Sequence, residues 1–252
     1  MTARIWTAAL LVIGDEILSG RTADANINQV ARWLDQQAIR LAEVRVVPDV
    51  HDRIVDAVRA LKATTDYLFT TGGIGPTHDD ITVDAVAAAL GVPVVIHPQA
   101  RAMLERYYGD KGGLTDARLR MARVPDGAEL IVNRLSGAPG IRLDTTFILA
   151  GVPHIAAGML EALNGELEGG ERVLSRTLGA MVPESEVAEI LAAVERAHDG
   201  CQIGSYPFFR AGRVGANFVV RSTDAGALAA CATALAERLA AMDIATVDGG
   251  IE

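Results

Sequence analysis

Short apolar segments alternate with amphipathic segments over the first two thirds of the chain. Residues 7–13 (TAALLVI) are almost continuously apolar, which is typical of a strand covered on both faces of a parallel sheet. Residues 26–38 follow, and their apolar side chains recur at helical spacing. Because this strand–helix unit repeats, we predict an α/β fold with three layers, in which helices cover both faces of a mostly parallel sheet.

The same patterns predict the remaining elements and a domain boundary. Further strands are expected at 41–47, 67–71, 93–96, 129–132 and 145–150, and helices at 51–62, 80–90, 98–108, 115–122 and 153–164. Residues 165–171 are glycine-rich and acidic, which is typical of a boundary. Beyond it we expect the order strand, helix, strand, strand, helix at 172–180, 184–197, 201–206, 214–222 and 224–241. We therefore predict one domain over 1–166 and a small α+β domain over 171–252.

Composition excludes several classes of function. The chain has 23 Lys and Arg against 32 Asp and Glu, a net charge of −9, and no basic run, so we expect no nucleic-acid partner. No apolar stretch approaches the length of about 18 residues that suggests a membrane span, so no membrane partner is expected. The two cysteines and five histidines show no metal-binding spacing. These features favour a cytoplasmic protein.

The stretch TTGGIGPTHDD, residues 70–80, follows the third predicted strand. Gly72, Gly73 and Gly75 lack Cβ atoms, so their N–H groups can approach an anion closely. The stretch is neither a P-loop nor a dinucleotide fingerprint, because it lacks the GK[ST] ending and the third spaced glycine. Glycine spacing alone leaves two interpretations open, an ordinary tight turn and a phosphate site.

Two aspartates end this stretch. Asp79 is a candidate helix N-cap and Asp80 a favourable first-turn acid. Negative charge there opposes a phosphate in the same turn unless a cation lies between them, and Mg²⁺ binds one or two carboxylates together with phosphate oxygens. Thr77 is a candidate to add a hydroxyl to such a site.

A second polar cluster follows the first predicted strand. Asp15 and Glu16 are expected at the carboxyl edge of the sheet, where open α/β sheets bind ligands. Two acidic pairs at one edge favour a metal and phosphate site over plain surface charge. Arg21 is a candidate phosphate ligand, while Asp24 is expected to cap the next helix and Asn26 either to cap it or to bind a ligand. Gly151, at the end of another strand, allows close backbone approach.

Four segments carry a resemblance to a known family. They are GDEILSGRTADAN at 14–26, TTGGIGPTHDDITVDAV at 70–86, N…GAPG at 133–140 and GVP at 151–153. On these the chain resembles the MoaB/Mog-like molybdopterin-binding domain family, and within it the N-terminal part of the competence/damage-inducible CinA type. Residues 172–241 resemble the KH-like domain that follows there. The chain departs from the family pattern at Ala25, Ile141 and Ala150.

The resemblance implies a three-layer αβα domain that forms a dimer or trimer and binds a small molecule through its phosphate. It implies a divalent metal such as Mg²⁺, with K⁺ as a further candidate, and molybdopterin as a candidate ligand. Matched to this sequence, the signature turn is Gly72, Gly73, Gly75, Thr77, Asp79 and Asp80, and the first acidic pair is Asp15 and Glu16. The amidohydrolase domain of longer members is absent, so its activity is not expected.

Three functions follow as expectations. The leading one is a metal-dependent pyrophosphatase acting on ADP-ribose or a related nucleoside diphosphate derivative. In it Asp79, Asp80 and Glu16 would be catalytic, and Asp80, Asp15 and Glu16 would hold the metal. The alternatives are a non-catalytic molybdopterin or nucleotide-binding module and a nucleotidyltransferase of the molybdenum-cofactor or FAD-synthase type. The C-terminal unit is expected to have a structural or oligomer-contact role.

Overall fold

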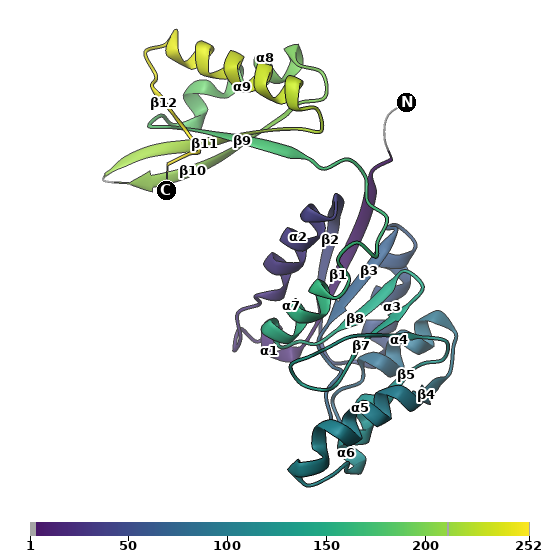
Figure 1. Ribbon diagram of the computed structural model, residues 1–252. Helices are drawn as coiled ribbons and strands as arrows, with labels where there is room; N and C mark the ends of the chain where they lie inside the picture. Colours follow the sequence, from purple (N-terminus) through teal and green to yellow (C-terminus); the bar gives the residue numbers. More distant parts are fainter. Residues whose placement is uncertain (1–3, 211, 252) are drawn as a thin grey trace. The chain divides into compact units, whose positions relative to one another are not determined.

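The computed structural model describes residues 4–210 and 212–251 (Figure 1). The chain forms two compact units, which divide between Gly170 and Glu171. Each unit has a sheet and a core of its own, so the two are described separately.

The first unit is built on a sheet of six strands in the order β2-β1-β3-β8-β7-β6. Its bounds are β1 Trp6–Ile13, β2 Ile39–Val47, β3 Tyr67–Thr71, β6 Glu129–Ile131, β7 Gly140–Leu143 and β8 Thr146–Leu149. The first four strands in this order run parallel, whereas β7 and β6 join antiparallel at one edge. The prediction of a mostly parallel sheet is therefore confirmed.

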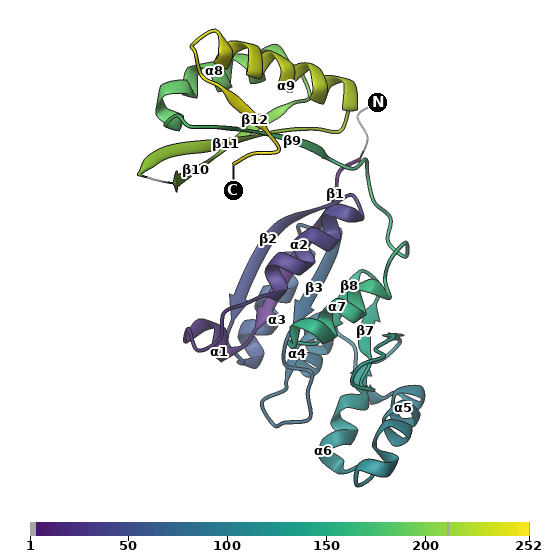
Figure 2. The ribbon, with the colours of Figure 1, turned by 60° about the vertical axis from the view of Figure 1, so that its left-hand side comes forward.

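Helices cover both faces of this sheet, as the apolar patterns predicted. The helices of this unit are α1 Asp15–Leu18, α2 Asn26–Gln36, α3 His51–Lys62, α4 Thr82–Leu90, α5 Pro98–Tyr108, α6 Asp116–Leu119 and α7 Pro153–Glu161. Of these, α2, α3, α4 and α7 contribute the buried side chains that pack on the sheet. One core lies between the sheet and α2 with α7, where Phe69 and Phe147 stack with ring centroids 4.7 Å apart. A second core packs Val58 and Val86, from α3 and α4, on the opposite face (Figure 2).

A small subdomain projects between α4 and β6. It pairs β4 Val94–Ile96 with β5 Arg123–Pro125 antiparallel, and α5 packs against the short 3₁₀ helix η2, Arg120–Ala122. A second 3₁₀ turn, η1 Gly109–Lys111, follows α5. Ala100, Leu104 and Ala122 form its own small buried cluster.

The structure corrects three details of this unit. Helix α4 begins at Thr82, with Ile81 in the capping position, so the prediction that Asp79 caps this helix is wrong. A strand that the sequence pattern did not predict, β7, begins at Gly140 and forms a hairpin with β8. Asp15 and Glu16 lie in a four-residue helix, α1, which is too short for a periodic pattern to reveal.

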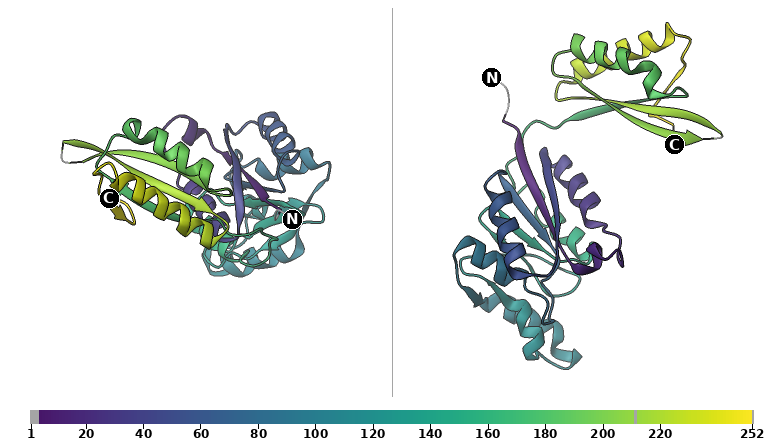
Figure 3. Two further views of the ribbon diagram at one scale, coloured as in Figure 1. Left: turned by 90° about the horizontal axis from the view of Figure 1, so that it is seen from above. Right: turned by 180° about the vertical axis from the view of Figure 1, so that it is seen from behind.

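The second unit is a four-stranded antiparallel sheet with two helices on one face (Figure 3). Its elements are β9 Leu174–Ala180, α8 Glu184–Ala197, β10 Gln202–Arg210, β11 Arg213–Ser222, α9 Ala225–Ala240 and β12 Thr246–Asp248. The predicted order and α+β class are confirmed, and β12 is an additional strand that pairs with β9. Within the described residues of both units, no helix has the length and apolar character needed to cross a bilayer.

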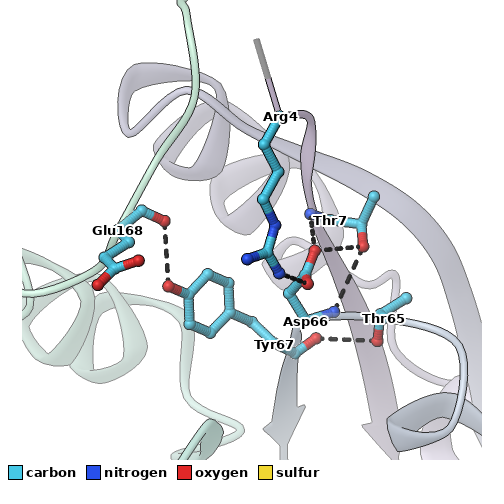
Figure 4. A network of polar contacts seen from close by, with 6 residues as sticks. All are labelled: Arg4, Thr7, Thr65, Asp66, Tyr67 and Glu168. Carbon is cyan, nitrogen blue, oxygen red and sulfur yellow. Dashed lines mark hydrogen bonds and ion pairs between the residues drawn. The ribbon is translucent and has the colours of Figure 1, made fainter.

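A polar network ties the start of β1 to the start of β3 in the first unit (Figure 4). The Asp66 carboxylate accepts hydrogen bonds from the Thr7 N–H at 2.8 Å and the Thr7 hydroxyl at 2.9 Å. The Arg4 guanidinium donates to the other carboxylate oxygen at 2.6 Å. The bond from the Thr7 N–H and the contact with Arg4 lower the pKa of Asp66, so the network stabilises its ionised form.

The variant Asp66→Asn is expected to lower the free energy of unfolding of the first unit by about 1–2 kcal/mol at pH 7. An acid whose pKa is lowered by folding contributes stability above its unfolded pKa, and this stability is lost as the pH falls through the lower folded value. The difference in the free energy of unfolding between the wild type and the variant should therefore become smaller below about pH 4. Urea denaturation at several pH values measures it, and Asp56→Asn, an exposed acid on α3, serves as the control. A difference that stays constant with pH would contradict the role of the charge.

Candidate functional site

Three parallel strands, β1, β3 and β8, end side by side, and the turns that follow them are in contact. Gly72 has a φ of +102°, and a Cβ at this position would lie 2.1 Å from the Ile13 carbonyl oxygen at the end of β1. A Cβ at Gly151, after β8, would lie 3.1 Å from the Gly72 Cα. The structure thus brings the glycine turn and the acidic pair to one sheet edge, as the strand order predicted.

Two hydrogen bonds from Thr82 hold the glycine turn, residues 72–75, in place. The buried Thr82 hydroxyl donates to the Gly72 carbonyl at 2.9 Å, and the Thr82 N–H donates to the Gly73 carbonyl at 3.1 Å. The Gly72 N–H is already bound to the Leu149 carbonyl at 3.2 Å, so it is not available to a ligand. Among the residues that the structure describes, no protein acceptor binds the N–H groups of Gly73, Ile74 or Gly75. The candidate anion nest is therefore 73–75, one residue shorter than predicted.

Asp80 is held against this turn by Thr77. One Asp80 carboxylate oxygen accepts from the Thr77 N–H at 2.7 Å and from the Thr77 hydroxyl at 2.5 Å. The same oxygen lies where a Cβ of Gly75 would meet it at 2.7 Å, so only glycine allows this approach. Thr77 thus orients Asp80, while Asp79 is fully exposed beside it. This places a half-buried carboxylate directly next to the candidate nest.

A third acidic residue, Asp49, lies next to Asp15 and Glu16, and the sequence analysis did not identify it. Asp15 and Glu16 are exposed on α1, and the Asp15 N–H donates to the carboxylate of Asp49 at 2.9 Å. Burial raises the pKa of Asp49, and the charges of Asp15, Glu16 and Asp79 raise it further, against the lowering effect of the Asp15 N–H. Asp49 follows β2 at the same sheet edge, which is the signal that could have identified it.

A pocket lies at the end of β1, next to the acidic pair. It is lined by Glu16, Asn26, Thr71 and Gly151, among others, and the Thr71 hydroxyl is buried with no hydrogen-bond partner within the described residues. The Asn26 side chain donates to the Gly151 carbonyl at 2.8 Å and accepts from Gln29 at 2.8 Å. Asn26 therefore ties α2 to the turn after β8 and leaves little of its amide for a ligand.

Two other residues near this pocket have different environments. Asp24 accepts from the Ile27 N–H at 2.7 Å and so binds a donor in the first turn of α2, although the capping position itself is held by Ala25 and not by Asp24 as predicted. Arg21 is exposed and does not line the pocket. The structure therefore gathers Glu16, Asn26 and Gly151 in one pocket and leaves Arg21 outside it.

The donors at this edge suit a metal ion that is shared with a phosphate. Within residues 4–210 and 212–251, no three Asp, Glu, His or Cys side chains converge to form a complete metal site. One Asp80 carboxylate oxygen is held by Thr77, and its partner oxygen has no hydrogen bond from the described residues. Mg²⁺ typically takes one or two carboxylates and completes its shell with phosphate oxygens and water. The residues present fit that arrangement.

Comparison with known proteins finds a family match in each unit. Residues 9–168 match the family described as "Probable molybdopterin binding domain", and residues 172–248 match the one described as "FAD synthase, middle domain". The α+β class of the second unit is confirmed, whereas its resemblance to a KH-like domain stays a prediction.

Relatives with similar sequences come from bacteria and archaea. A CinA-like protein from Desulfosudis oleivorans is 36% identical over 209 residues, which cover 78% of this chain and 51% of that protein. A protein from Pyrobaculum calidifontis is 34% identical over 211 residues, which cover 80% of each. This chain thus spans about half the length of the first relative and about four fifths of the second.

A solved structure extends the similarity to the fold. The protein CinA from Thermoplasma acidophilum, whose function is given as unknown, is 32% identical with a TM-score of 0.61, and the match covers 64% of this chain and 98% of that one. Because the family match spans residues 9–168 and that solved chain is matched almost completely, the chain belongs to the MoaB/Mog-like molybdopterin-binding domain family and has CinA-like proteins as its relatives.

Proposed function

We propose that this protein binds a nucleotide derivative through a pyrophosphate group and hydrolyses the pyrophosphate bond with a divalent metal such as Mg²⁺. ADP-ribose is the substrate to test first. The observation that carries the proposal is the juxtaposition of the N–H groups of 73–75 with the oriented carboxylate of Asp80. An anion nest next to a carboxylate favours a phosphate bound together with a cation.

The residues at this edge divide the chemistry between them. The N–H groups of 73–75 would bind phosphate oxygens and stabilise the negative charge that develops on them in the transition state. Asp80, with Asp15 or Glu16, would hold the metal, which when bound supplies Lewis-acid activation of the phosphate and acidifies a bound water. Asp79 or Glu16 would orient the attacking water and accept its proton. Addition of water across the pyrophosphate of ADP-ribose yields AMP and ribose 5-phosphate.

Incubation of the purified protein with ADP-ribose and Mg²⁺, Mn²⁺ or Co²⁺ tests this proposal. We expect AMP to form only when a divalent ion is present and to stop forming when a chelator is added. Absence of AMP with all three ions, together with tight binding of molybdopterin, would favour a non-catalytic binding module instead.

One observation supports a second candidate, nucleotidyl transfer. Residues 172–248 match the middle domain of FAD synthase, and a phosphate site like this one could equally hold a nucleotide that donates its adenylyl group. Incubation with ATP and either molybdopterin or FMN distinguishes the two activities. Release of pyrophosphate that depends on the second substrate would support transfer over hydrolysis.

A further inference from the structure

A second pocket lies on the α4 side of the glycine turn, and it contains two arginines that the proposed chemistry does not use. We call it the arginine pocket and define it by six of its lining residues: Gly75, Asp80, Asp84, Arg120, Arg123 and Ile141. Gly75 and Asp80 also belong to the candidate phosphate site, so the arginine pocket and the phosphate site have these two lining residues in common. A ligand bound on the glycine turn therefore has the arginine pocket directly beside it.

One of the two arginines is already neutralised. The Arg123 guanidinium donates two hydrogen bonds to Asp84, through Nη1 to one carboxylate oxygen at 3.0 Å and through Nη2 to the other. Both side chains are about one-third exposed. This bidentate pair joins β5 to α4, so Arg123 is occupied by a structural contact.

The other arginine, Arg120, has N–H groups that are not fully hydrogen-bonded. Its Nε is shielded from solvent and has no acceptor within the described residues. Its Nη2 lies 3.5 Å from the main-chain carbonyl oxygen of Asp80, at the limit of hydrogen bonding. Among residues 4–210 and 212–251, no carboxylate forms an ion pair with Arg120, and the nearby Asp80 carboxylate accepts hydrogen bonds from Thr77 instead. An arginine keeps its charge at any working pH, so an unneutralised cation faces this pocket.

A buried guanidinium N–H without an acceptor destabilises the empty protein, and an anion relieves this cost. The fork of an arginine matches phosphate oxygens in geometry as well as in charge. We propose that Arg120 binds the second phosphate of a ligand whose first phosphate lies on the N–H groups of 73–75. The site would then select ligands with two adjacent phosphates over ligands with one. This inference rests on the proposed phosphate site, but it does not depend on hydrolysis.

Calorimetric titration with AMP and with α,β-methylene-ADP, both in the presence of MgCl₂, tests the inference. These probes differ by one phosphate, and the methylene bridge prevents cleavage. The wild type should bind the diphosphate at least about 10-fold more tightly than AMP. Arg120→Gln should weaken binding of the diphosphate about 10- to 100-fold and of AMP by less than about 2-fold. Arg120→Lys should restore part of the difference, because it keeps the charge but loses the fork.

Arg101→Gln is the matched control, because Arg101 lies on α5 of the same subdomain, is exposed and pairs with Glu105. It should leave both affinities unchanged. Thermal unfolding without ligand should show Arg120→Gln to be at least as stable as the wild type, since the variant removes a buried donor that has no partner. A stability loss there, or an equal loss of affinity for both probes, would make Arg120 a structural residue and overturn the inference.

The outcomes separate this inference from the proposed function. A diphosphate preference that depends on Arg120, without AMP formation from ADP-ribose, would support the inference and contradict the hydrolase. A wild type that hydrolyses ADP-ribose but binds both probes equally would overturn the inference alone. A wild type that binds neither probe would overturn both.

Discussion

The variant Asp80→Asn is expected to lower AMP formation from ADP-ribose by about 10²–10³-fold at a fixed Mg²⁺ concentration. Asparagine has the same shape as aspartate, and its side-chain oxygen can still accept the two hydrogen bonds from Thr77. The turn should therefore keep its geometry while the charge that would bind the metal is lost. Steady-state rates over a range of Mg²⁺ concentrations measure the loss, which should shift the half-saturating concentration upwards as well.

Asp56→Asn is the control for a general effect of charge. Asp56 is exposed on α3, away from the glycine turn in sequence, and removing its charge should change the rate by less than about twofold. Equal AMP formation by the wild type and Asp80→Asn would show that Asp80 does not hold a catalytic metal. Unchanged thermal unfolding of both variants would confirm that rates, and not folding, are being compared.

The variant Gly72→Ala is expected to destabilise the first unit by about 3 kcal/mol or more. Alanine is strained at a φ of +102°, and its Cβ would lie 2.1 Å from a main-chain oxygen that cannot move without disturbing β1. Both tryptophans of the chain, Trp6 and Trp33, belong to this unit, so their fluorescence in a urea titration follows its unfolding alone.

Gly91→Ala separates backbone strain from close packing. Gly91 ends α4 with a φ of +73°, but a Cβ there would meet no atom within 4 Å. This variant should therefore cost only about 1 kcal/mol. Similar losses for the two variants would contradict the close approach of β1 to the glycine turn, on which the position of the site depends.

Much of the fold could be predicted because the spacing of apolar residues within each strand or helix shows which of its faces is buried. The strand at Tyr67–Thr71 is buried at every position, and the helix at His51–Lys62 buries one stripe of apolar side chains. The sequence also predicted that the glycine turn lies near Asp15 and Glu16, because both follow predicted parallel strands and such strands end at a common edge of the sheet.

Other features depend on contacts that local sequence does not encode. The strand β7, Gly140–Leu143, is only four residues long and is held between β8 and β6. The strand β12, Thr246–Asp248, is only three residues long and pairs with β9. Arg120 is a single residue outside any motif, and Asp49 is marked only by its position after β2. Asn26 is a candidate from the sequence, but its contact with Gly151, 125 residues away, is visible only in the folded chain.

The candidate phosphate donors at 73–75 are main-chain N–H groups, and this sets how binding would respond to solution and to mutation. Amide groups do not titrate in the working pH range, so any pH dependence of phosphate binding would report the carboxylates of the rim and the ionisation of the ligand itself. A main-chain donor also has no side chain to replace. Its strength can be changed only indirectly, through residues such as Thr82 that hold the turn in place. Under the proposed function, the affinity for phosphate would thus depend on the backbone, and the selection of the ligand would depend on the side chains around it.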